Sequence, residues 1–342
     1  MMNEVLVITC AGGKQAGHLI PLLYNKGKFR LRLAAHSSAS TSKLRSSYPD
    51  AEVIQTDTSS LANCRDLLRG ATAVYHVGPS FHSHEKEMGL NMVDAAVVES
   101  RRQDSKFKHF VFSSVLCTQH RNLMQHDLKS YIEERLFLSP LNWTILKPTN
   151  FMDAYPVAVL AAQEHPVMEK LWTPEVPNSL IALRDLAEAS AKVLHDGAAH
   201  YLAEYPLCST MPLSDAHVID AIGKRIGKAI EIKAPSFETG VSKALNYLFH
   251  NSSSGTTTAS EVYAGNVEAS SSIIEGDWAH NDLAAEGDVR GDIVRDEAER
   301  LVLFYTRRGL KGSPNVLRWL LGREPTTVEQ WIEIQMEQAG LA

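Results

Sequence analysis

The sequence predicts an α/β protein with a Rossmann-type, doubly wound parallel sheet and a smaller α/β second lobe. Two patterns favour this class. Within the first 150 residues, short apolar runs typical of buried strands alternate with amphipathic helical segments, the order in which crossover helices join parallel strands. The first apolar run also leads through a glycine-rich turn directly into a helical pattern, as in the first βαβ unit of such folds.

The elements follow one another in order along this first part of the chain. An apolar run predicts a strand at Val5–Thr9, and short segments rich in apolar residues predict further strands at Phe29–Ala35, Ala51–Gln55, Ala73–Val77, Phe107–Ser113 and Trp143–Leu146. Apolar residues at helical spacing predict helices at Ala16–Tyr24, Leu61–Arg69, Gly89–Glu99 and Leu128–Phe137. Because the carboxyl ends of parallel strands share one edge of a sheet, we expect a ligand to bind along that edge.

The pattern changes after Pro148. Helical patterns and one short strand predict a second lobe from Tyr155–Glu164, Leu183–Leu194, Ser214–Ile226, Ala229–Lys233, 290–306 and 315–338. We therefore expect a nucleotide-binding domain at 1–150 and a lobe for substrate or partner at 151–342. Residues 251–287 are rich in Ser, Thr, Gly, Ala and acidic residues, which favours a flexible insertion, either a surface segment or a lid over a ligand.

The composition of the chain argues against several classes of function. The chain of 342 residues carries a formal net charge of −6, which argues against direct nucleic-acid binding, because a phosphate backbone requires a basic surface. The first residues lack the features of a secretory signal, and no apolar run approaches the roughly 20 residues that cross a bilayer. No CxxC pair occurs among the four cysteines, which favours reduced thiols. We therefore expect a cytoplasmic protein without a membrane partner.

The glycine turn is the first candidate site. Small residues there let backbone N–H groups and a helix N-terminus approach a pyrophosphate, and Gly13 is the best candidate for the position of closest approach. Cys10 and Ala16 stand where a GxxGxxG pattern would have glycine, so an ordinary strand–helix turn is the alternative. The predicted cofactor-binding residues of this turn are Ala11, Gly12, Gly13, Lys14, Gln15 and Ala16.

The end of the second strand bears on the choice of cofactor. An NAD-specific site places an acid about 20 residues past the glycines, to hold the ribose hydroxyls. Here the strand ends in His36 and Ser37 without an acid, and Lys43 and Arg45 follow, a set that suits a 2′-phosphate better. The alternative is that these are solvated loop residues. We predict NADP(H) as the preferred cofactor and NAD(H) as the alternative, with Asp57, after the third strand, meeting the adenine.

Several motifs in a fixed order resemble one known family. They include the turn at Ala11–Ala16, the segments Val74–Pro79 and Phe107–Ser114, the run from Lys129 to Glu134, and the run from Thr144 to Met152. Together they resemble the NmrA-like proteins, a branch of the atypical short-chain dehydrogenases. The resemblance implies that Val77, Gly78 and Pro79 lie beneath a nicotinamide and that Lys129 contacts its ribose. It also adds Pro148 and Phe151 to the cofactor-binding set.

The chain departs from the usual dehydrogenase pattern at the proton donor. Short-chain dehydrogenases use Tyr-x-x-x-Lys, but the position four residues before Lys129 is Gln125. We therefore predict Lys129, Ser114 and His126 as the catalytic residues, with water as another proton source. The resemblance implies an NADPH-dependent reductase of a small, largely apolar carbonyl or enone compound. Two alternatives are a non-catalytic NADP(H) sensor that binds a regulatory protein, and a redox-neutral isomerase or dehydratase with a structural cofactor.

Two weaker patterns occur near the expected site. His82 and His84 lie two residues apart near the expected site, but no third ligand can be named, so we predict no metal and consider a proton-transfer role for either ring. Aromatic and apolar side chains fall in segments near the expected pocket, with ordinary core packing as the alternative. They are Phe81, Phe151, Met152, Tyr155 and Trp172.

Overall fold

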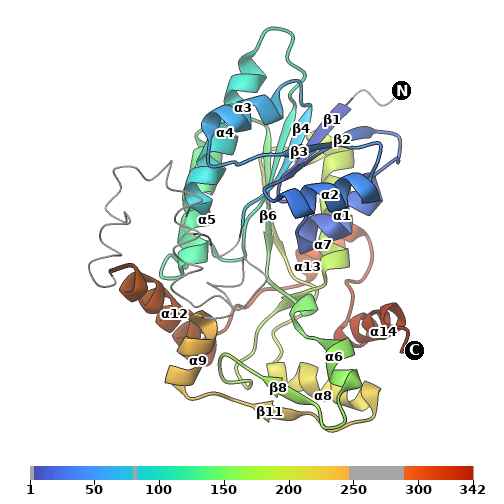
Figure 1. Ribbon diagram of the computed structural model, residues 1–342, viewed down its shortest axis with the longest axis vertical. Helices are drawn as coiled ribbons and strands as arrows, with labels where there is room; N and C mark the ends of the chain where they lie inside the picture. The colour runs from blue at the N-terminus through green and yellow to red at the C-terminus, as the bar shows by residue number, and fades with distance from the viewer. Residues whose placement is uncertain (1–3, 80–81, 83, 246–288, 342) are drawn as a thin grey trace.

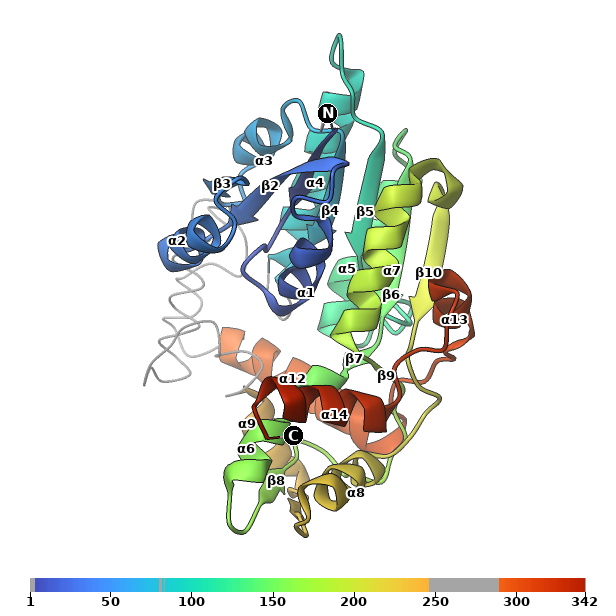
Figure 2. The same cartoon turned by 90° about the vertical axis from the view of Figure 1, so that its right-hand side faces the viewer.

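The computed structural model describes residues 4–79, 82, 84–245 and 289–341. The expected insertion at 251–287 therefore lies outside the described residues, as does Phe81. Figures 1 and 2 show a sheet flanked by helices in the upper part of the molecule, with a smaller group of elements below it.

The central sheet has seven strands in the order β10-β6-β5-β4-β1-β2-β3. Every pair of neighbouring strands is parallel. The chain runs outward from β1 through β2 to β3, then returns to the other side of β1 and continues outward from β4. The strands are β1 Glu4–Ile8, β2 Phe29–Ala35, β3 Glu52–Gln55, β4 Ala73–Val77, β5 His109–Ser113, β6 Trp143–Pro148 and β10 Ala203–Leu207. The predicted doubly wound Rossmann class is confirmed.

Alternation along the strands buries both faces of the sheet. In β1, Leu6 and Ile8 join one apolar cluster with helices α1 (Lys14–Leu23) and α7 (Leu183–Asp196), whereas Val7 joins the cluster on the opposite face. That second cluster includes apolar residues of α3 (Leu61–Leu68), α4 (Glu85–Arg101) and α5 (Met124–Phe137). Successive side chains of a strand point to opposite faces, so one short apolar run supplies both cores.

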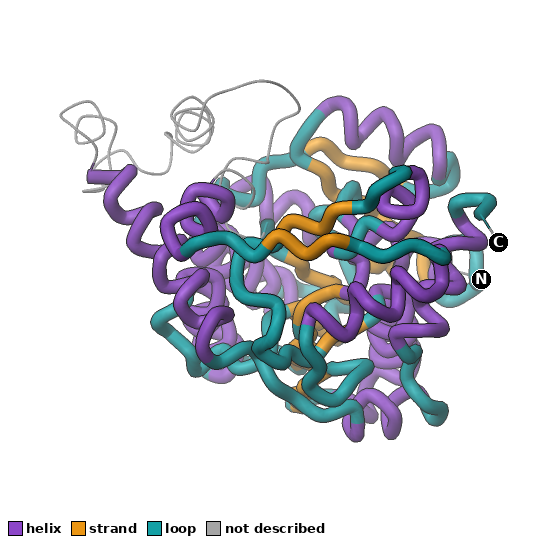
Figure 3. Tube along the Cα trace, turned by 90° about the horizontal axis from the view of Figure 1, so that it is seen from below, coloured by secondary structure: helices purple, strands orange, loops and turns teal. Residues whose placement is uncertain are grey.

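Segments beyond residue 150 contribute to both parts of the molecule. Strand β10 pairs with β6, and helix α7 covers the same face of the sheet as α1 (Figure 2). Helix α13 (Asn315–Leu321) adds Leu317 and Leu320 to this cluster. The rest of this region forms the lower lobe, seen from below in Figure 3. Its elements are η1 Met152–Ala154, α6 Val157–Ala162, β8 Val167–Glu169, α8 Asp215–Ile226, β11 Glu231–Lys233, α9 Phe237–Ala244, α12 Val289–Arg307 and α14 Val328–Gln338.

Strand β6 leads directly into this lobe. The short strand β7 (Asn150–Phe151) follows β6 and pairs with β9 (Leu180–Ile181). The lobe core includes Met152, Tyr155 and Trp331, which explains why two of the expected pocket residues are packing residues. The lobe lies beyond the carboxyl ends of the sheet strands (Figure 1).

Some elements differ from the sequence expectation. Helix α4 begins at Glu85 rather than Gly89, and the segment 315–338 contains two helices. The first of these ends at Gly322, whose φ of +67° favours glycine and stops the helix. Helix α2 (Ser38–Ser47) was not predicted, because it is rich in serine and buries only Thr41 and Leu44. Within the described residues, no helix combines the length and apolar character that crossing a bilayer requires.

Candidate functional site

The reversal of strand order between β1 and β4 defines the candidate site. Crevices at such a reversal, outside the carboxyl ends of the strands, are where open α/β sheets bind ligands. Thr9 joins the two strand ends: its hydroxyl donates to the Val77 carbonyl at 2.9 Å and accepts from the Val77 N–H at 2.8 Å. The turn after β1 and the segment after β4 therefore start from fixed positions.

The turn after β1 is shaped for a close backbone approach. Cys10 adopts a φ of +46°, in the left-handed region that usually favours glycine, and this is the first glycine position of the motif. A Cβ on Gly13 would lie 3.1 Å from the Cys10 carbonyl oxygen, so any side chain there would crowd the turn. Helix α1 begins directly afterwards and has no acidic residue in its first turn, which leaves its N-terminus attractive to an anion.

The other predicted residues of this turn have separate roles in the structure. Ala11 is buried, and its N–H donates to the Ala34 carbonyl at 2.9 Å, which ties the turn to β2. Ala16 is also buried, where α1 packs on the sheet. Gly12 and Lys14 are exposed. Gln15 accepts a hydrogen bond from the Ser113 hydroxyl at 2.8 Å, so its side chain reaches the carboxyl end of β5.

Helix α2 starts beside the glycine turn. Ser37 caps it by accepting from the Ser40 N–H at 3.2 Å, and a Cβ on Gly12 would come within 3.0 Å of the Ser40 hydroxyl oxygen. His36 and Lys43 are exposed at this end of the sheet. Arg45, in contrast, donates to the Val53 carbonyl at 3.3 Å and is directed to β3.

Asp57 lies after β3 and organises the following turn by accepting from the Ser59 N–H at 2.9 Å. Burial lowers the pKa of His82 to about 4; positive charge on His84 and His36 lowers it further, and Asp57 opposes the shift. These side chains are therefore close enough to influence one another. Within the described residues, no group of three or more His, Cys, Asp or Glu side chains could hold a metal ion.

A buried ion pair lies at the same strand ends. The ammonium of Lys129, on α5, contacts Oε1 of Glu85, the first residue of α4, and the two side chains are 7% and 0% exposed. Gly78 makes room for this pair, since a Cβ there would lie 2.7 Å from Glu85 Oε1. Burial raises the pKa of the Glu85 carboxyl, and the neighbouring Lys129 charge opposes the rise.

Cys10 places this ion pair next to the glycine turn. The pKa of its thiol is raised to about 12, mainly by burial and also by the negative charge of Glu85, whereas Lys129 acts in the opposite direction. Cys10, Gly78, Glu85 and Lys129 therefore form one group at the reversal between β1 and β4. Glu85 is not among the site residues predicted from the sequence, although an acidic residue in the first turn of a helix is a recognised signal.

Ser114 is engaged in a separate buried network. Its hydroxyl donates to Glu133 at 2.5 Å, and the Thr118 hydroxyl donates to the other oxygen of the same carboxylate at 2.9 Å. Lys147 completes the network with an ion pair to Glu133 at 3.0 Å. The Ser114 proton is therefore held by Glu133.

His126 is also engaged. Its Nδ1 lies 2.9 Å from the Cys117 carbonyl oxygen, which can only accept, so Nδ1 carries the proton of this hydrogen bond. Burial lowers the pKa of His126 to about 4, with the Lys129 charge as a further lowering cause, so the ring is neutral at pH 7. A neutral ring protonated on Nδ1 presents an acceptor at Nε2 rather than an acid.

The remaining predicted residues lie along the same edge. Val77 and Pro148 end β4 and β6, and both are buried; Pro79 and Phe151 are partly exposed, and Phe151 packs against the core between the sheet and α7. Trp172 stacks on Tyr305 of α12 with ring centroids 4.3 Å apart. Trp172 therefore contacts α12.

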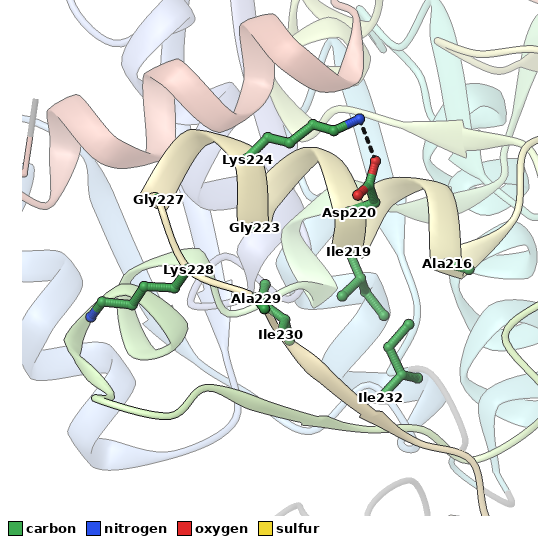
Figure 4. A pocket seen from close by; sticks show the side chains of 10 residues that line it. All are labelled: Ala216, Ile219, Asp220, Gly223, Lys224, Gly227, Lys228, Ala229, Ile230 and Ile232. Carbon is green, nitrogen blue, oxygen red and sulfur yellow. Dashed lines mark ion pairs between the residues drawn. The ribbon is translucent and has the colours of Figure 1, made fainter.

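Two cavities lie away from these strand ends. One of about 500 Å³ separates α8 from β11, and Figure 4 shows Ile219, Ile230 and Ile232 between the helix and the strand, with Lys224 paired to Asp220. Another of about 340 Å³ lies among α1, α7 and α14, and its lining includes His18. Neither is lined by a predicted cofactor-binding residue.

The comparisons with solved structures and with family models agree with each other. No curated relative matches the chain. Among solved structures, the chain is similar to an NADPH-dependent quinone oxidoreductase from Escherichia coli crystallised with NADPH (TM-score 0.68, 17% identity, covering 97% of this chain and 99% of that one). It is similar to a triphenylmethane reductase from Citrobacter sp. crystallised with NADP(H) (TM-score 0.67, 14% identity, 98% and 99% covered).

A third similar structure is that of NmrA, a negative transcriptional regulator, in complex with NADP (TM-score 0.64, 14% identity, 100% and 99% covered). At these identities the structural likeness concerns the fold. The family model for NmrA-like proteins matches residues 2–273, most of the chain, with the glycine turn and Lys129 inside the match. The protein belongs to the NmrA-like family.

Proposed function

We propose that the protein binds NADP(H) along the carboxyl edge of its sheet and reduces a small, largely apolar carbonyl or enone compound. The observation that carries the proposal is the buried Glu85–Lys129 pair beside the glycine turn, at the reversal of strand order. The reductases with NADPH and NADP(H) among the similar structures support the same reading.

The residues present fit a dinucleotide phosphate. The open N-terminus of α1 suits the pyrophosphate, because no acidic side chain opposes it and the Gly12–Gly13 backbone is uncovered. The start of α2 suits the 2′-phosphate through Ser37 and His36, with Lys43 adding positive charge on the same helix. Lys129 suits a hydroxyl-bearing group at the strand ends. When bound, the cofactor supplies the hydride.

Aromatic side chains support an apolar substrate. Phe304 and Tyr305 of α12 contact each other at 5.3 Å, and Phe304 contacts His120 at 5.4 Å between centroids. The Tyr305 hydroxyl donates to Asn150, just past β6, at 2.9 Å. These contacts bring α12 against the segment between β5 and α5, where the carboxyl edge meets the lower lobe.

In this proposal the protein orients the bound ligands and polarises the substrate oxygen, and it does not supply the proton from an acid of its own. Lys129 contributes positive charge near a developing oxyanion, and its pairing with Glu85 restricts where that charge lies. Ser114 donates to Glu133 and His126 is neutral, so neither is a ready proton donor. Water is therefore the proton source that this arrangement favours.

A titration and a turnover measurement test the proposal. Calorimetry with NADPH and NADH should give saturable binding with NADPH the tighter ligand. Single-turnover oxidation of NADPH should then occur with at least one member of a panel of quinones, aromatic ketones and enones. Binding without oxidation across the panel would reject the reductase, and absence of binding would reject the cofactor.

A sensor that binds a regulatory protein according to its NADP(H) state is the second candidate. The specific observation in its favour is that Ser114 and His126, the two predicted proton donors, are both engaged in internal hydrogen bonds. A similar structure belongs to a transcriptional regulator in complex with NADP. If the turnover panel fails while NADPH still binds, this candidate takes precedence.

A further inference from the structure

The cavity among α1, α7 and α14 lies where the sheet domain meets the C-terminal helix. Its volume of about 340 Å³ is within the range of small-molecule sites. Gly17, Pro21 and Leu22 of α1 line it and are exposed, so the cavity opens to solvent, and Trp331 and Ile334 of α14 line it as well. A small molecule can therefore reach this cavity without passing the strand ends.

The indole of Trp331 brings an unused hydrogen-bond donor to the cavity. Only 2% of Trp331 is exposed, and its Nε1–H has no hydrogen-bond partner among the described residues. The ring packs edge-on against Tyr155 in the lobe core, with ring centroids 6.4 Å apart, which fixes its position. Buried tryptophan N–H groups usually find an acceptor, and one without a partner is costly. The cavity is where a ligand can supply that acceptor.

Helix α1 brings a hydrogen-bond acceptor to the same cavity. Pro21 lies inside the helix and has no N–H, so the carbonyl of Gly17, four residues earlier, lacks its usual helical donor. Gly17 and Pro21 both line the cavity, and a Cβ on Gly17 would meet nothing within 4 Å. The backbone of this turn is therefore open to a ligand that donates.

The rest of the lining favours a neutral, apolar ligand. Arg184 pairs with Glu188 at 3.5 Å, and Asp153 accepts from the Leu183 N–H at 3.1 Å, so the acids and the arginine of the lining already have partners. Between them the lining is apolar, which suits a ring that leaves water. The apolar lining residues include Pro21, Leu22, Ala187 and Ile334.

We propose that this cavity binds a neutral, largely apolar ring compound with one hydrogen-bond acceptor and one donor. The acceptor receives the Trp331 Nε1–H, and the donor binds the Gly17 carbonyl. The site is separate from the carboxyl edge of the sheet, so this inference does not depend on the proposed function.

The test uses 2-quinolinone, a rigid neutral bicycle with one carbonyl and one N–H. The chain has five tryptophans, so ¹⁵N labelling gives a small set of indole N–H signals, and Trp331→Phe assigns the one from Trp331. The probe should move this signal downfield in a saturable way, and the signal of Trp319, which is 66% exposed, should stay in place. 1-Methyl-2-quinolinone lacks the donor and should bind about 3- to 10-fold more weakly, the effect of losing one hydrogen bond.

Gly17→Leu tests the place of binding without altering Trp331. Its side chain enters the cavity from an exposed position with free space around the Cβ, so the variant should fold and lose detectable probe binding. Ala229→Leu is the matched control, because exposed Ala229 lines the other cavity, beside α8 (Figure 4). It should keep the wild-type affinity for the probe. Far-ultraviolet circular dichroism checks the fold of each variant.

Each contrary result rejects a stated part of the inference. A Trp331 signal that does not move at the solubility limit of 2-quinolinone would reject the site, even if the probe binds at the strand edge. Full affinity in Gly17→Leu would place the probe elsewhere. Equal affinity for the methylated probe would reject the bond to the Gly17 carbonyl, and tighter binding of benzoate or benzylamine would reject a neutral ligand.

Discussion

The effect of Lys129 on the protein depends on its ion-pair partner. On the surface of a helix it would be an ordinary cation, but here it is buried and opposes Glu85. Replacing one member of a buried ion pair leaves the other charged and uncompensated, whereas replacing both by apolar residues is often tolerated. The same pair therefore bears on stability as well as on the site.

We predict that Lys129→Met lowers the free energy of unfolding by about 3–5 kcal/mol, because Glu85 is left buried without a counter-charge. The double variant E85L/K129M should recover most of this loss. Urea unfolding followed by fluorescence measures both. Arg135→Met, at the exposed Asp94–Arg135 pair of the same two helices, should cost less than about 1 kcal/mol; a similar loss at both positions would contradict the argument.

Gly13 allows a second prediction at the residue scale. Its φ of −83° and ψ of 167° are allowed for valine, so Gly13→Val should fold. The branched side chain would nevertheless stand beside the Cys10 carbonyl, where a Cβ already lies 3.1 Å away, and would cover the turn. NADPH binding should fall below detection by calorimetry.

Gly17 provides the control for this variant. It is exposed at the fourth residue of α1, and a Cβ there would meet nothing within 4 Å. Gly17→Ala should keep NADPH affinity and raise the free energy of unfolding by about 0.5–1 kcal/mol, through better helix propensity. Undiminished NADPH affinity in Gly13→Val would remove the turn from the site.

At the scale of elements, helix α2 determines cofactor preference in our proposal. It starts at the end of β2, where the chain has His36 and Ser37 instead of an acid. An acid at this position would hold the ribose hydroxyls of NAD(H) and repel a 2′-phosphate.

We predict that His36→Asp lowers NADPH affinity about tenfold or more and leaves NADH affinity equal or higher, an effect of about 1.4 kcal/mol or more. Parallel calorimetric titrations with the two cofactors measure it. Arg45→Gln serves as the control, because Arg45 is directed to the Val53 carbonyl. Tighter binding of NADH than of NADPH by the wild type would overturn the assignment.

At the scale of the whole molecule, buried histidines link stability to pH. Burial lowers the pKa of His76 and His109 to about 3 and that of His126 to about 4, from the ordinary value of 6.5. The unfolded chain therefore takes up protons that the folded protein excludes. We therefore predict that the contribution of these histidines to the free energy of unfolding is fully present above about pH 6.5 and is lost as the pH drops from 6.5 toward 4.

Each of these histidines contributes a slope of up to about 1.4 kcal/mol per pH unit in that range. Unfolding free energies from urea titrations between pH 7.5 and about 4.5 should reveal the loss. His109→Phe should make the curve less steep, since phenylalanine cannot protonate while His76 and His126 still can; His217→Gln, at an exposed position of α8, should leave the slope unchanged. A flat profile for the wild type would contradict the prediction.

The sequence by itself determined the fold class and most of the strand positions. β2 and β4 match the predicted Phe29–Ala35 and Ala73–Val77 residue for residue, because the alternating pattern of FRLRLAA and the mostly apolar run AVYHV are each visible within a few residues. The position of the glycine turn was also predictable, since it depends on local turn chemistry.

Only the tertiary structure decided the rest. β10 carries alternating exposed residues and joins the sheet at its edge beside β6, a pairing that no local pattern specifies. Glu85 and Lys129 are 44 residues apart, and neither predicts the other. The neutral ring of His126 likewise depends on burial and on the Cys117 carbonyl. Ion pairs and proton positions arise from long-range packing and local dielectric, which periodicity along one chain does not encode.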